Sequence, residues 1–587
     1  MKLPALLQSK SHRNVILLIA VPFFAAGGAV KVFHSLQQPE REKFLIDCEP
    51  LVLWLCLALV VAGVVKAFPH IAAHLREADR GLKRKLLAVL LFALIVRAFV
   101  APWTHRLYFD EDIYLSIAQN MASEGKAAAT NFAIYRWDDY KLRDGFLNKQ
   151  PNGYPAMISL VFMVFGVSEK AATVLSIALS SLTPLLLFLL VQKLCGDRAA
   201  LWASLFQAMQ PVAAAWATSA STETPLAFTV CLVLYLLCLF DEKGDYYILA
   251  AAAAGLALAV QIRPEAVLVL TLVPFFLVHG RRTLGQAVQY PVTTIIMMIL
   301  CLLLFCHVIH MLHFIDNSWG ADEGGKFSIG YLSRNAGPNF GFFAGNRDFP
   351  FFFLLLAVLG IFAGKTLVRN RIFLLCWWAL FFLPYLFFYA GSYRYGVDVR
   401  FVIPALCPVS ALCGLGAEKV QQMLSAVFRS PFQAVLAAVA VLFLPFLPFI
   451  RTVHEEAWQA RFDHQFITRE AALLPQDSII FSHSPYVITV NSKRGALQSY
   501  FGSSAEKVGE VFSLTDHVYF YRDYWCFAKE TEQNFNYFNE HFKLTRQSAE
   551  KMYDREYALY KVELNQPTDT DRRKNSSDDT KCYSGRN

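Results

Sequence analysis

The chain has 587 residues, of which 56% are hydrophobic, 14% aromatic and 17% charged. Because an ordinary soluble protein carries about 25% charged residues, this composition excludes a purely soluble protein and predicts a polytopic membrane protein with one smaller soluble domain. The net charge of +8 comes without a long basic run, so no nucleic-acid partner is predicted. Many of the twelve cysteines lie in apolar runs and none forms a CxxC pair, which disfavours a metal or disulfide scaffold.

Long apolar runs recur along the whole chain. Since about 20 apolar residues cross a bilayer as a helix, the sequence predicts about thirteen transmembrane helices. The first run contains Lys31 and is followed by many others, which favours a membrane helix over a cleaved signal peptide. The runs lie near residues 14–33, 50–68, 86–104, 170–192, 199–217, 225–240, 246–262, 265–279, 289–312, 350–364, 372–390, 400–415 and 432–450.

Basic residues gather in alternate loops between these runs. Lys and Arg are enriched on the cytoplasmic side of membranes, so the alternation predicts a cytoplasmic N-terminus and an extracytoplasmic C-terminal region. It also places the loop 105–169 outside, with the short apolar stretch 153–166 as a helix along the membrane surface. The basic residues are Lys2, Lys10, Arg13, Arg76, Arg80, Lys83, Arg84, Lys85, Lys193, Arg198, Arg281, Arg282, Lys365, Arg369 and Arg371.

The composition changes near residue 452. Stretches rich in β-branched and aromatic residues at 478–481, 486–490 and 517–521 are typical of strands, with helical patterns between them. They predict a small extracytoplasmic α/β domain over 452–564. The segment 565–587 has almost no apolar residues and is expected to be disordered.

The predicted fold is therefore an α-helical polytopic membrane protein with a small C-terminal extracytoplasmic α/β domain. Residues 86–451 form its membrane core, and this core includes the extracytoplasmic loop 105–169. Residues 1–85 add two transmembrane helices ahead of the core.

Three consecutive acids, Asp110, Glu111 and Asp112, follow directly after an apolar run. One unpaired acid costs about 2.5–3.5 kcal/mol at the centre of a bilayer, so these carboxylates must lie in water or in a polar cavity at the membrane edge. The later part of the same loop and the other outward loops carry acids and cations that would meet them on the same face. These are Lys149, Glu223, Arg263, Glu265, Lys326, Arg334, Arg347, Arg394, Asp398 and Arg400.

Acids and cations gathered on one face suit a reaction between charged groups. A carboxylate near an acceptor hydroxyl can act as a general base, and arginine or lysine can hold a phosphate. Sugar transfer from a lipid phosphate needs both, because the base activates the acceptor while cations stabilise charge on the departing phosphate. The same residue types equally suit a transporter with an acidic coupling site.

Each candidate also has a purely structural interpretation. Acids at 110–112 are favoured at a helix N-terminus by the helix dipole, and Asp112 is expected to do no more than begin a helix. Lys149 would reach the headgroups from a surface helix, and Glu223 lies in a helix-start signal. Three histidines near the end of one run share a helix face only in pairs, which favours a structural role over a metal site. They are His307, His310 and His313.

Four motifs occur in order on the predicted outer side: residues 110–118 (Asp-Glu-x-x-Tyr-x-x-Ile-Ala), 149–155 (Lys-Gln-Pro-Asn-Gly-Tyr-Pro), 222–225 (Thr-Glu-Thr-Pro) and 398–404 (Asp-Val-Arg-Phe-Val-Ile-Pro). Together, over roughly residues 86–450, they resemble the family that includes the bacterial lipid A aminoarabinose transferases and the protein O-mannosyltransferases. These are integral-membrane glycosyltransferases of the C superfamily, glycosyltransferase family 39-like.

Two positions depart from the pattern of that family. Gln150 stands where its Lys-Pro-Pro loop has the first proline, and Glu223 stands where its second acidic turn usually has aspartate. These departures leave the sugar and the acceptor open more than the class of reaction.

The resemblance implies a transferase that takes a sugar from a polyprenyl-phosphate carrier and inverts its anomeric centre by direct attack of the acceptor. It implies Asp110 as catalytic base or acceptor-positioning acid, Glu111 in support and Glu223 as a second site acid. Lys149 and Arg400 would contact the lipid phosphate. The residues implied in substrate binding are Lys149, Tyr114, Arg263, Arg394 and Arg400.

The predicted function is thus a glycosyltransferase on the outer face of a bacterial inner membrane, with a polyprenyl-phosphate-linked sugar donor and a lipid, glycan or protein acceptor. No cofactor or metal is expected. The alternative is a transporter or flippase of a charged lipid or solute. Transporters more often carry ionisable residues at mid-span and internal repeats, and the sequence contains no convincing repeat. A non-catalytic scaffold would leave the outer charges unexplained.

Overall fold

The structure is a computed structural model. It describes Gly27, Gly28, Lys31 and Phe33 and, beyond them, the ranges 35–107, 110–130, 133–136, 139–142, 145–277, 291–314, 325–362, 367–394, 398–425, 427–453, 455–491, 493–498, 505–527 and 529–565. The chain divides into two compact units. The membrane unit comprises Met1–Ala129 and Phe146–Trp458, and the sheet unit comprises Thr130–Gly145 and Gln459–Asn587.

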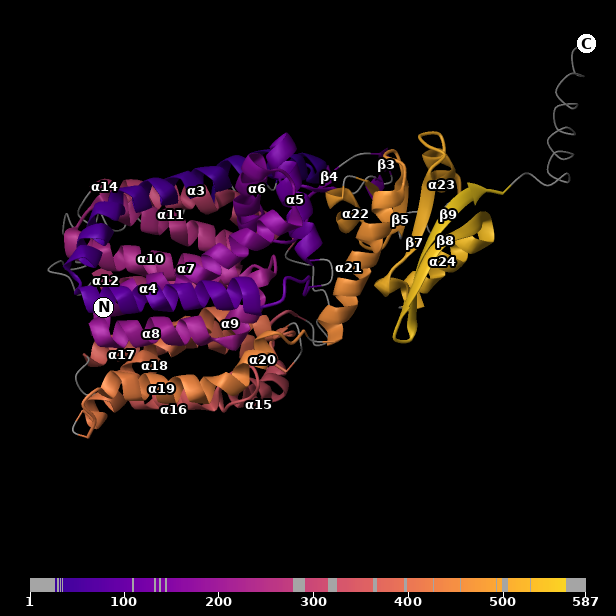
Figure 1. The fold of residues 1–587 in the computed structure, drawn as a ribbon. Helices are drawn as coiled ribbons and strands as arrows, with labels where there is room; N and C mark the ends of the chain where they lie inside the picture. Colours follow the sequence, from indigo (N-terminus) through magenta and orange to yellow (C-terminus); the bar gives the residue numbers. More distant parts are fainter. Residues whose placement is uncertain are drawn as a thin grey trace, which may run out of the picture. The chain divides into compact units, whose positions relative to one another are not determined.

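The membrane unit is a bundle of helices that run side by side (Figure 1). Five segments are long and apolar enough to cross a membrane: Gln38–Glu77, Glu169–Cys195, Glu223–Lys243, Asp398–Leu424 and Pro431–Ile450. Shorter apolar helices accompany them. The helices are α3 (Gln38–Glu77), α4 (Arg80–Ile95), α5 (Asp110–Glu124), α6 (Gly153–Phe165), α7 (Glu169–Cys195), α8 (Asp197–Met209), α9 (Pro211–Ala215), α10 (Glu223–Lys243), α11 (Tyr246–Ile262), α12 (Val273–Leu277), α14 (Pro291–His313), α15 (Tyr331–Phe343), α16 (Phe351–Ile361), α17 (Val368–Leu386), α18 (Ile403–Leu424), α19 (Pro431–Phe443) and α20 (Leu447–Ile450).

Several predicted spans differ from the helices observed. The run 199–217 breaks between α8 and α9, because Pro211 has no N–H to continue the helical ladder. The run 265–279 begins as a 3₁₀ helix, η3 (Pro264–Leu272), and the expected loop 313–349 contains α15. Most of the run 14–33 lies outside the described residues. The predicted polytopic helical fold is confirmed, while the count of about thirteen spans stays a prediction.

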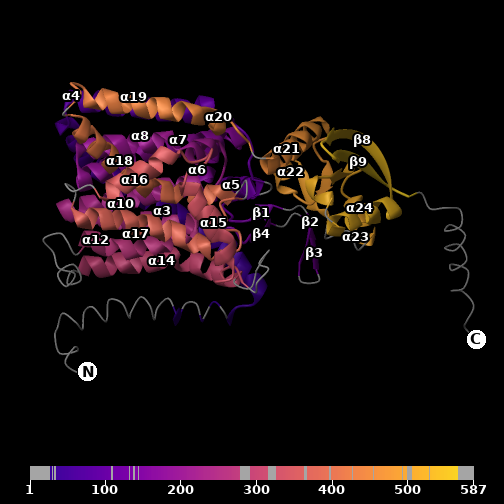
Figure 2. The same ribbon diagram turned by 90° about the horizontal axis from the view of Figure 1, so that it is seen from below.

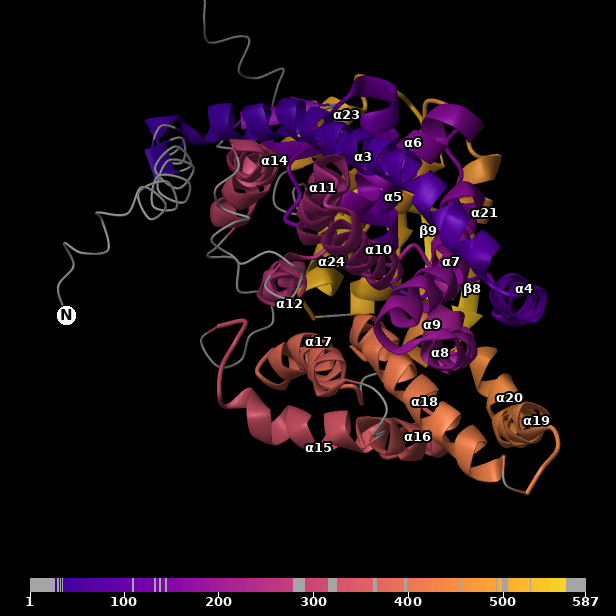
Figure 3. The same cartoon turned by 90° about the vertical axis from the view of Figure 1, so that its left-hand side faces the viewer.

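Helices α10 and α18 form the interior of the membrane unit. The apolar stretch of α18 is wholly buried and that of α10 nearly so, whereas α3 and α19 expose most of theirs. Viewed along the bundle, α11 and α7 lie beside α10 (Figure 3). Glycine permits the close packing of α18, because a Cβ at Gly414 would lie 2.5 Å from the Ala199 carbonyl oxygen and one at Gly416 would lie 1.9 Å from that of Leu356.

The sheet unit is built on a mixed five-stranded sheet in the order β6-β5-β7-β9-β8. Strand β5 pairs in parallel with β6 and β7, while β9 pairs antiparallel with β7 and β8. Helices α21 and α22 lie on one side of the strands and α23 and α24 on the other (Figure 2). The elements are α21 (Glu455–Leu473), β5 (Ile479–Ser482), α22 (Tyr486–Val490), β6 (Arg494–Leu497), α23 (Ala505–Val511), β7 (Val518–Arg522), α24 (Lys529–His541), β8 (Phe542–Met552) and β9 (Arg555–Leu564).

Alternate residues of the central strands supply the two cores of the sheet unit. Ile479 and Phe481 pack on the side of α23 and α24, while Ile480 packs on the side of α21 and α22. This alternation is the two-residue period of a strand with both faces covered. The predicted α/β character of the C-terminal region is thereby confirmed.

Two of the three predicted strands are correct, and one is wrong. The stretches 478–481 and 517–521 correspond to β5 and β7, but Tyr486–Val490 is helix α22. Pro485 precedes it with φ −69° and ψ −13°, a helical conformation that proline accommodates ahead of a first helical turn. The hairpin of β8 and β9 was not predicted, and the segment 566–587, with its expected disorder, lies outside the described residues.

Candidate active site

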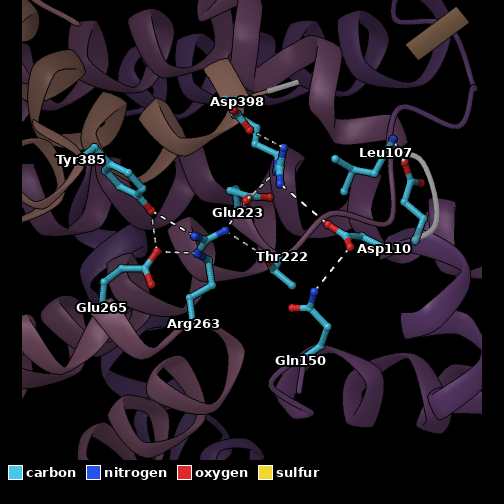
Figure 4. Close-up of polar contacts among 11 residues, drawn as sticks. Leu107, Asp110, Gln150, Thr222, Glu223, Arg263, Glu265, Tyr385 and Asp398 are labelled. Carbon is cyan, nitrogen blue, oxygen red and sulfur yellow. Dashed lines mark hydrogen bonds and ion pairs between the residues drawn. The ribbon is translucent and has the colours of Figure 1, made fainter. Parts of the chain in front are cut away.

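Asp110 is the first residue of α5 and lies at the partly open edge of a charged cluster in the membrane unit (Figure 4). Its side chain is 27% exposed. Gln150 Nε2 donates to Asp110 Oδ1 at 3.4 Å, and Arg400 Nη2 lies 3.9 Å from Asp110 Oδ2. Asp110 is thus held from two sides by donors of other segments while part of its carboxylate remains accessible.

Glu223 is the buried anion of the cluster. It begins α10, its side chain is 1% exposed, and its Oε1 accepts from Arg400 Nε at 3.0 Å and from Arg263 Nη1. Among the described residues, its Oε2 has no hydrogen-bond partner. The helix dipole also favours a carboxylate at this position. Two guanidinium groups thus neutralise a carboxylate that keeps one oxygen without a donor.

Arg263 is clamped between segments from different parts of the chain. It precedes η3 and donates to Glu223, to Glu265 and, at 3.1 Å, to the hydroxyl of Tyr385 in α17. The Tyr385 hydroxyl in turn donates to Glu265 Oε1 at 2.6 Å. The ring of Tyr385 is stacked on the ring of Phe401, with 5.0 Å between the two ring centroids. This network fixes the orientation of Arg263 and, through it, that of Glu223.

Arg400 connects the two acids. It lies in the 3₁₀ turn η4 (Asp398–Val402) just before α18, and its guanidinium contacts Glu223, Asp110 and, at 3.4 Å, Asp398 Oδ1. The planar five-donor group of arginine suits such branching contacts better than lysine would. Its 3.9 Å separation from Asp110 is longer than a direct hydrogen bond.

The electrostatics of the cluster favour a carboxyl group at Asp110 that takes up a proton readily. Burial foremost, and the nearby carboxylates of Glu223 and Glu111, raise the pKa of Asp110, while Arg400 and Lys149 act in the opposite direction. Burial lowers the pKa of Lys149. The carboxylate of Asp110 acts in the opposite direction, and the positive charge of Lys326 lowers the pKa further. The pKa of Asp110 is therefore raised and the pKa of Lys149 is lowered, so the two values lie closer together than in isolated side chains.

Glu111 has a different environment from its neighbour Asp110. Its buried carboxylate accepts the backbone N–H groups of Arg106 at 2.7 Å, Leu107 at 2.8 Å and Ala220 at 2.9 Å. These bonds join the segment before α5 to the segment before α10. Glu111 therefore supports the backbone of the site, and its oxygens are already occupied.

The remaining predicted residues fall at different distances from the cluster. Asp112 is buried, with His105 Nε2 3.5 Å from its Oδ2. Tyr114 is buried one turn after Asp110, and burial, with the carboxylates of Asp110 and Glu223, raises its pKa, so its hydroxyl stays protonated. Arg394 is exposed and, within the described residues, forms no ion pair with the site acids.

The structure thus brings together Asp110, Glu223, Arg263 and Arg400 from four segments far apart in the chain, with Lys149 nearby. Sequence reasoning did not predict a site role for Tyr385 or Gln150. Tyr385 lies in a Phe-rich span with no polar neighbour to single it out. Gln150 was noted only as a departure from a proline motif, yet its amide reaches Asp110.

Comparison with known proteins supports the resemblance inferred from the motifs. Residues 149–309 match the family model of the dolichyl-phosphate-mannose-protein mannosyltransferases. This range contains Lys149, Glu223 and Arg263 but neither Asp110 nor Arg400. None of the curated proteins matches the sequence.

Solved structures of two membrane enzymes share the fold. ArnT of Cupriavidus metallidurans, bound to undecaprenyl phosphate, matches with a TM-score of 0.54 and 12% identity over 82% of this chain and 98% of that chain. The oligosaccharyltransferase of Archaeoglobus fulgidus, tethered to an acceptor peptide with the NVT sequon, matches with a TM-score of 0.50 and 12% identity over 83% of this chain and 74% of that chain. The chain therefore shares the fold of these two enzymes.

Proposed function

We propose that the protein is an inverting glycosyltransferase that moves a sugar from a polyprenyl-phosphate carrier to an acceptor on the outer face of the membrane. The observation that carries the proposal is the placement of Asp110, a partly exposed carboxylate with a raised pKa, beside Arg400 and within reach of the Lys149 loop. A base next to phosphate-binding cations is the pair that this reaction needs.

In the proposed reaction, an oxygen or nitrogen of the acceptor attacks the anomeric carbon of the donor sugar. The bond from that carbon to the phosphate oxygen breaks, and its electron pair leaves with the phosphate. Asp110 takes the acceptor proton, and Lys149 and Arg400 hold the phosphate as its charge grows. Glu223 and Arg263 keep Arg400 in place, and the Tyr114 hydroxyl is a donor for the bound substrate.

The likeness to ArnT supports a polyprenyl-phosphate donor, since that enzyme is seen bound to undecaprenyl phosphate. A lipid, glycan or protein serves as acceptor. We place the enzyme in the inner membrane of a bacterium with its N-terminus in the cytoplasm, so that Asp110 and the C-terminal domain face outward. Residues 86–451 form the transferase core in this proposal. Arg394, exposed on the same loop system as Arg400, remains a candidate for substrate contact.

The test is complementation of a deletion strain, followed by mass spectrometry of the envelope lipids and glycans. The strain is expected to lack one sugar modification and to accumulate the carrier-linked donor. Wild-type protein restores the modification, whereas Asp110→Asn does not, because removal of a general base costs about 10²–10⁴-fold in rate.

The matched control is Glu124→Gln, which neutralises an exposed acid at the other end of the same helix. It is expected to complement like wild type, with both variants present in the membrane at equal amounts. Full complementation by Asp110→Asn, or a deletion strain with unchanged lipids and glycans, would contradict the proposal.

A further inference from the structure

A second charged cluster lies inside the membrane unit, away from the acids of α5. Glu49 in α3 and His310 in α14 have side chains that are 0% exposed. His310 Nδ1 lies 3.1 Å from both oxygens of the Glu49 carboxyl group, and Asn152 Nδ2 donates to Glu49 Oε2 at 2.8 Å. Ionisable groups within membrane-spanning segments are costly and persist where they have a specific partner.

The hydrogen bonds of His310 determine where its protons lie. Its Nε2 is 2.7 Å from the backbone carbonyl oxygen of Asn148, which can only accept, so Nε2 carries a hydrogen. The remaining proton is shared between Nδ1 and Glu49. The two groups are then either an ion pair or two neutral partners, and in both cases their net charge is zero. This neutrality lowers the cost of burying them.

Both ends of a short loop are fastened to this pair. His310 binds the backbone of Asn148, and Glu49 binds the side chain of Asn152. Within the loop, Asn148 Oδ1 accepts the N–H of Gln150 at 3.0 Å, and the Gln150 side chain reaches Asp110. Lys149 lies between the two fastened ends.

The next residue closes the loop against α11. A Cβ at Gly153 would lie 2.5 Å from the backbone carbon of Gln261, so the loop backbone packs directly on that helix. Helix α3 is also joined to its surroundings by a bond from Trp54 Nε1 to Ser159 Oγ at 3.1 Å. The loop is therefore held by helices α3, α11 and α14. Of these, α3 precedes residues 86–450, which carry the four motifs of the resemblance.

We infer that Glu49 and His310 are positioning residues that hold Lys149 and Gln150 against Asp110, and that α3 is thereby part of the donor-binding machinery. This inference rests on the proposed role of Lys149 as a ligand of the donor phosphate. Glu49→Leu removes both acceptor oxygens, so the Asn152 end of the loop loses its partner while a side chain of similar size is kept.

The first measurement is the KM for the polyprenyl-phosphate-linked donor, with the purified full-length protein in lipid nanodiscs. Glu49→Leu and Asn152→Ala are each expected to raise this KM about tenfold, because a tenfold change corresponds to about 1.4 kcal/mol, which is of the order of one buried hydrogen bond. The kcat is expected to fall as well, because Lys149 holds the phosphate as its charge grows and Gln150 contacts the base Asp110. Trp54→Phe, which removes a bond of α3 that does not reach the loop, is the matched control and keeps the wild-type KM.

A double-mutant cycle separates positioning from general support of the fold. In the Lys149→Gln background, Glu49→Leu is expected to change the KM by less than about twofold, because the residue through which it acts is already gone. A tenfold change in both backgrounds, or a wild-type KM in Glu49→Leu and Asn152→Ala, would overturn the inference.

A readout without sugar transfer keeps this test distinct from that of the proposed function. The rate at which an amine-reactive reagent labels Lys149, mapped by mass spectrometry and referred to the exposed Lys126, is expected to rise in Glu49→Leu and not in Trp54→Phe. Unchanged labelling in an active enzyme overturns the positioning role. A wild-type protein without transfer or donor binding, but with the labelling difference, contradicts the proposed function alone.

Discussion

The two charged clusters of the membrane unit differ in how completely their hydrogen bonds are satisfied. At the Glu49–His310 pair, both carboxylate oxygens and both ring nitrogens have partners, and neither side chain is exposed. In the candidate active site, one oxygen of Glu223 has no hydrogen-bond partner among the described residues, and Asp110 is 27% exposed. A pair whose ionisable atoms all have partners is suited to hold structure, while a buried carboxylate with an unpartnered oxygen can accept a hydrogen bond from a ligand.

The same contrast separates the adjacent acids Asp110 and Glu111. Both oxygens of Glu111 accept backbone N–H groups, three in all, whereas among the described residues Asp110 has long contacts to Gln150 and Arg400. Two residues with the same charge and neighbouring positions thus have different capacities for chemistry. Substitutions in the candidate site test whether this difference in hydrogen bonding decides function.

The largest effect is expected from Glu223→Gln. Its removal leaves the charges of Arg263 and Arg400 without their shared buried anion, and breaking one partner of a buried ion pair costs about 3–5 kcal/mol. Thermal unfolding should therefore occur at a clearly lower temperature, with transfer reduced at the same time. A variant as stable and as active as wild type would show that this cluster does not depend on its central acid.

The pH dependence of transfer should reflect Asp110 on the acid side and Lys149 on the alkaline side. The pKa of Asp110 is raised, so the base is lost as pH falls through a value above the ordinary range of aspartate, and the rate drops about tenfold per pH unit below it. The pKa of Lys149 is lowered, so its charge is lost as pH rises toward a value below the ordinary range of lysine.

The two limbs can be assigned by mutation in a series of kcat/KM measurements. Lys149→Arg keeps the charge at all accessible pH values and is expected to move the alkaline limb upward while the acid limb stays. An unchanged alkaline limb in this variant would assign that limb to another group.

A smaller effect is expected from Arg400→Lys. A single ammonium group cannot reach Glu223, Asp110 and Asp398 together, so the KM for the donor is expected to rise about tenfold while the positive charge is kept. Arg429→Lys is the matched control, since Arg429 is exposed and is not among the proposed site residues. Equal effects of the two substitutions would contradict a special role for Arg400.

Much of the site could be predicted because its parts lie in polar motifs between apolar runs. Asp110, Glu223 and Arg400 stand at the ends of helices, where a charged residue beside an apolar run is conspicuous. Their placement on one face was predicted from the positive-inside pattern, which assigns alternate loops to opposite sides of the membrane. The fold class followed from the same runs.

The remaining features of the site depend on tertiary contacts, which leave no local pattern in the sequence. Tyr385 and Glu49 lie in or beside apolar runs, and only the packing of distant helices gives their polar atoms partners. The sequence favours a structural role for His310, but residue spacing within α14 does not indicate its partner Glu49 on α3. The helix α22 replaced a predicted strand because Pro485 set the backbone before the β-branched residues.

The central claim is that Asp110 and its cationic neighbours transfer a sugar from a carrier phosphate. The most direct measurement follows a purified, reconstituted protein that is given a polyprenyl-phosphate-linked sugar and an acceptor, with the products read by nuclear magnetic resonance and mass spectrometry. One carrier phosphate released for each sugar transferred, with inversion at the anomeric carbon, is the predicted result. Retention of configuration, or movement of the intact donor across the bilayer without cleavage, would contradict the account.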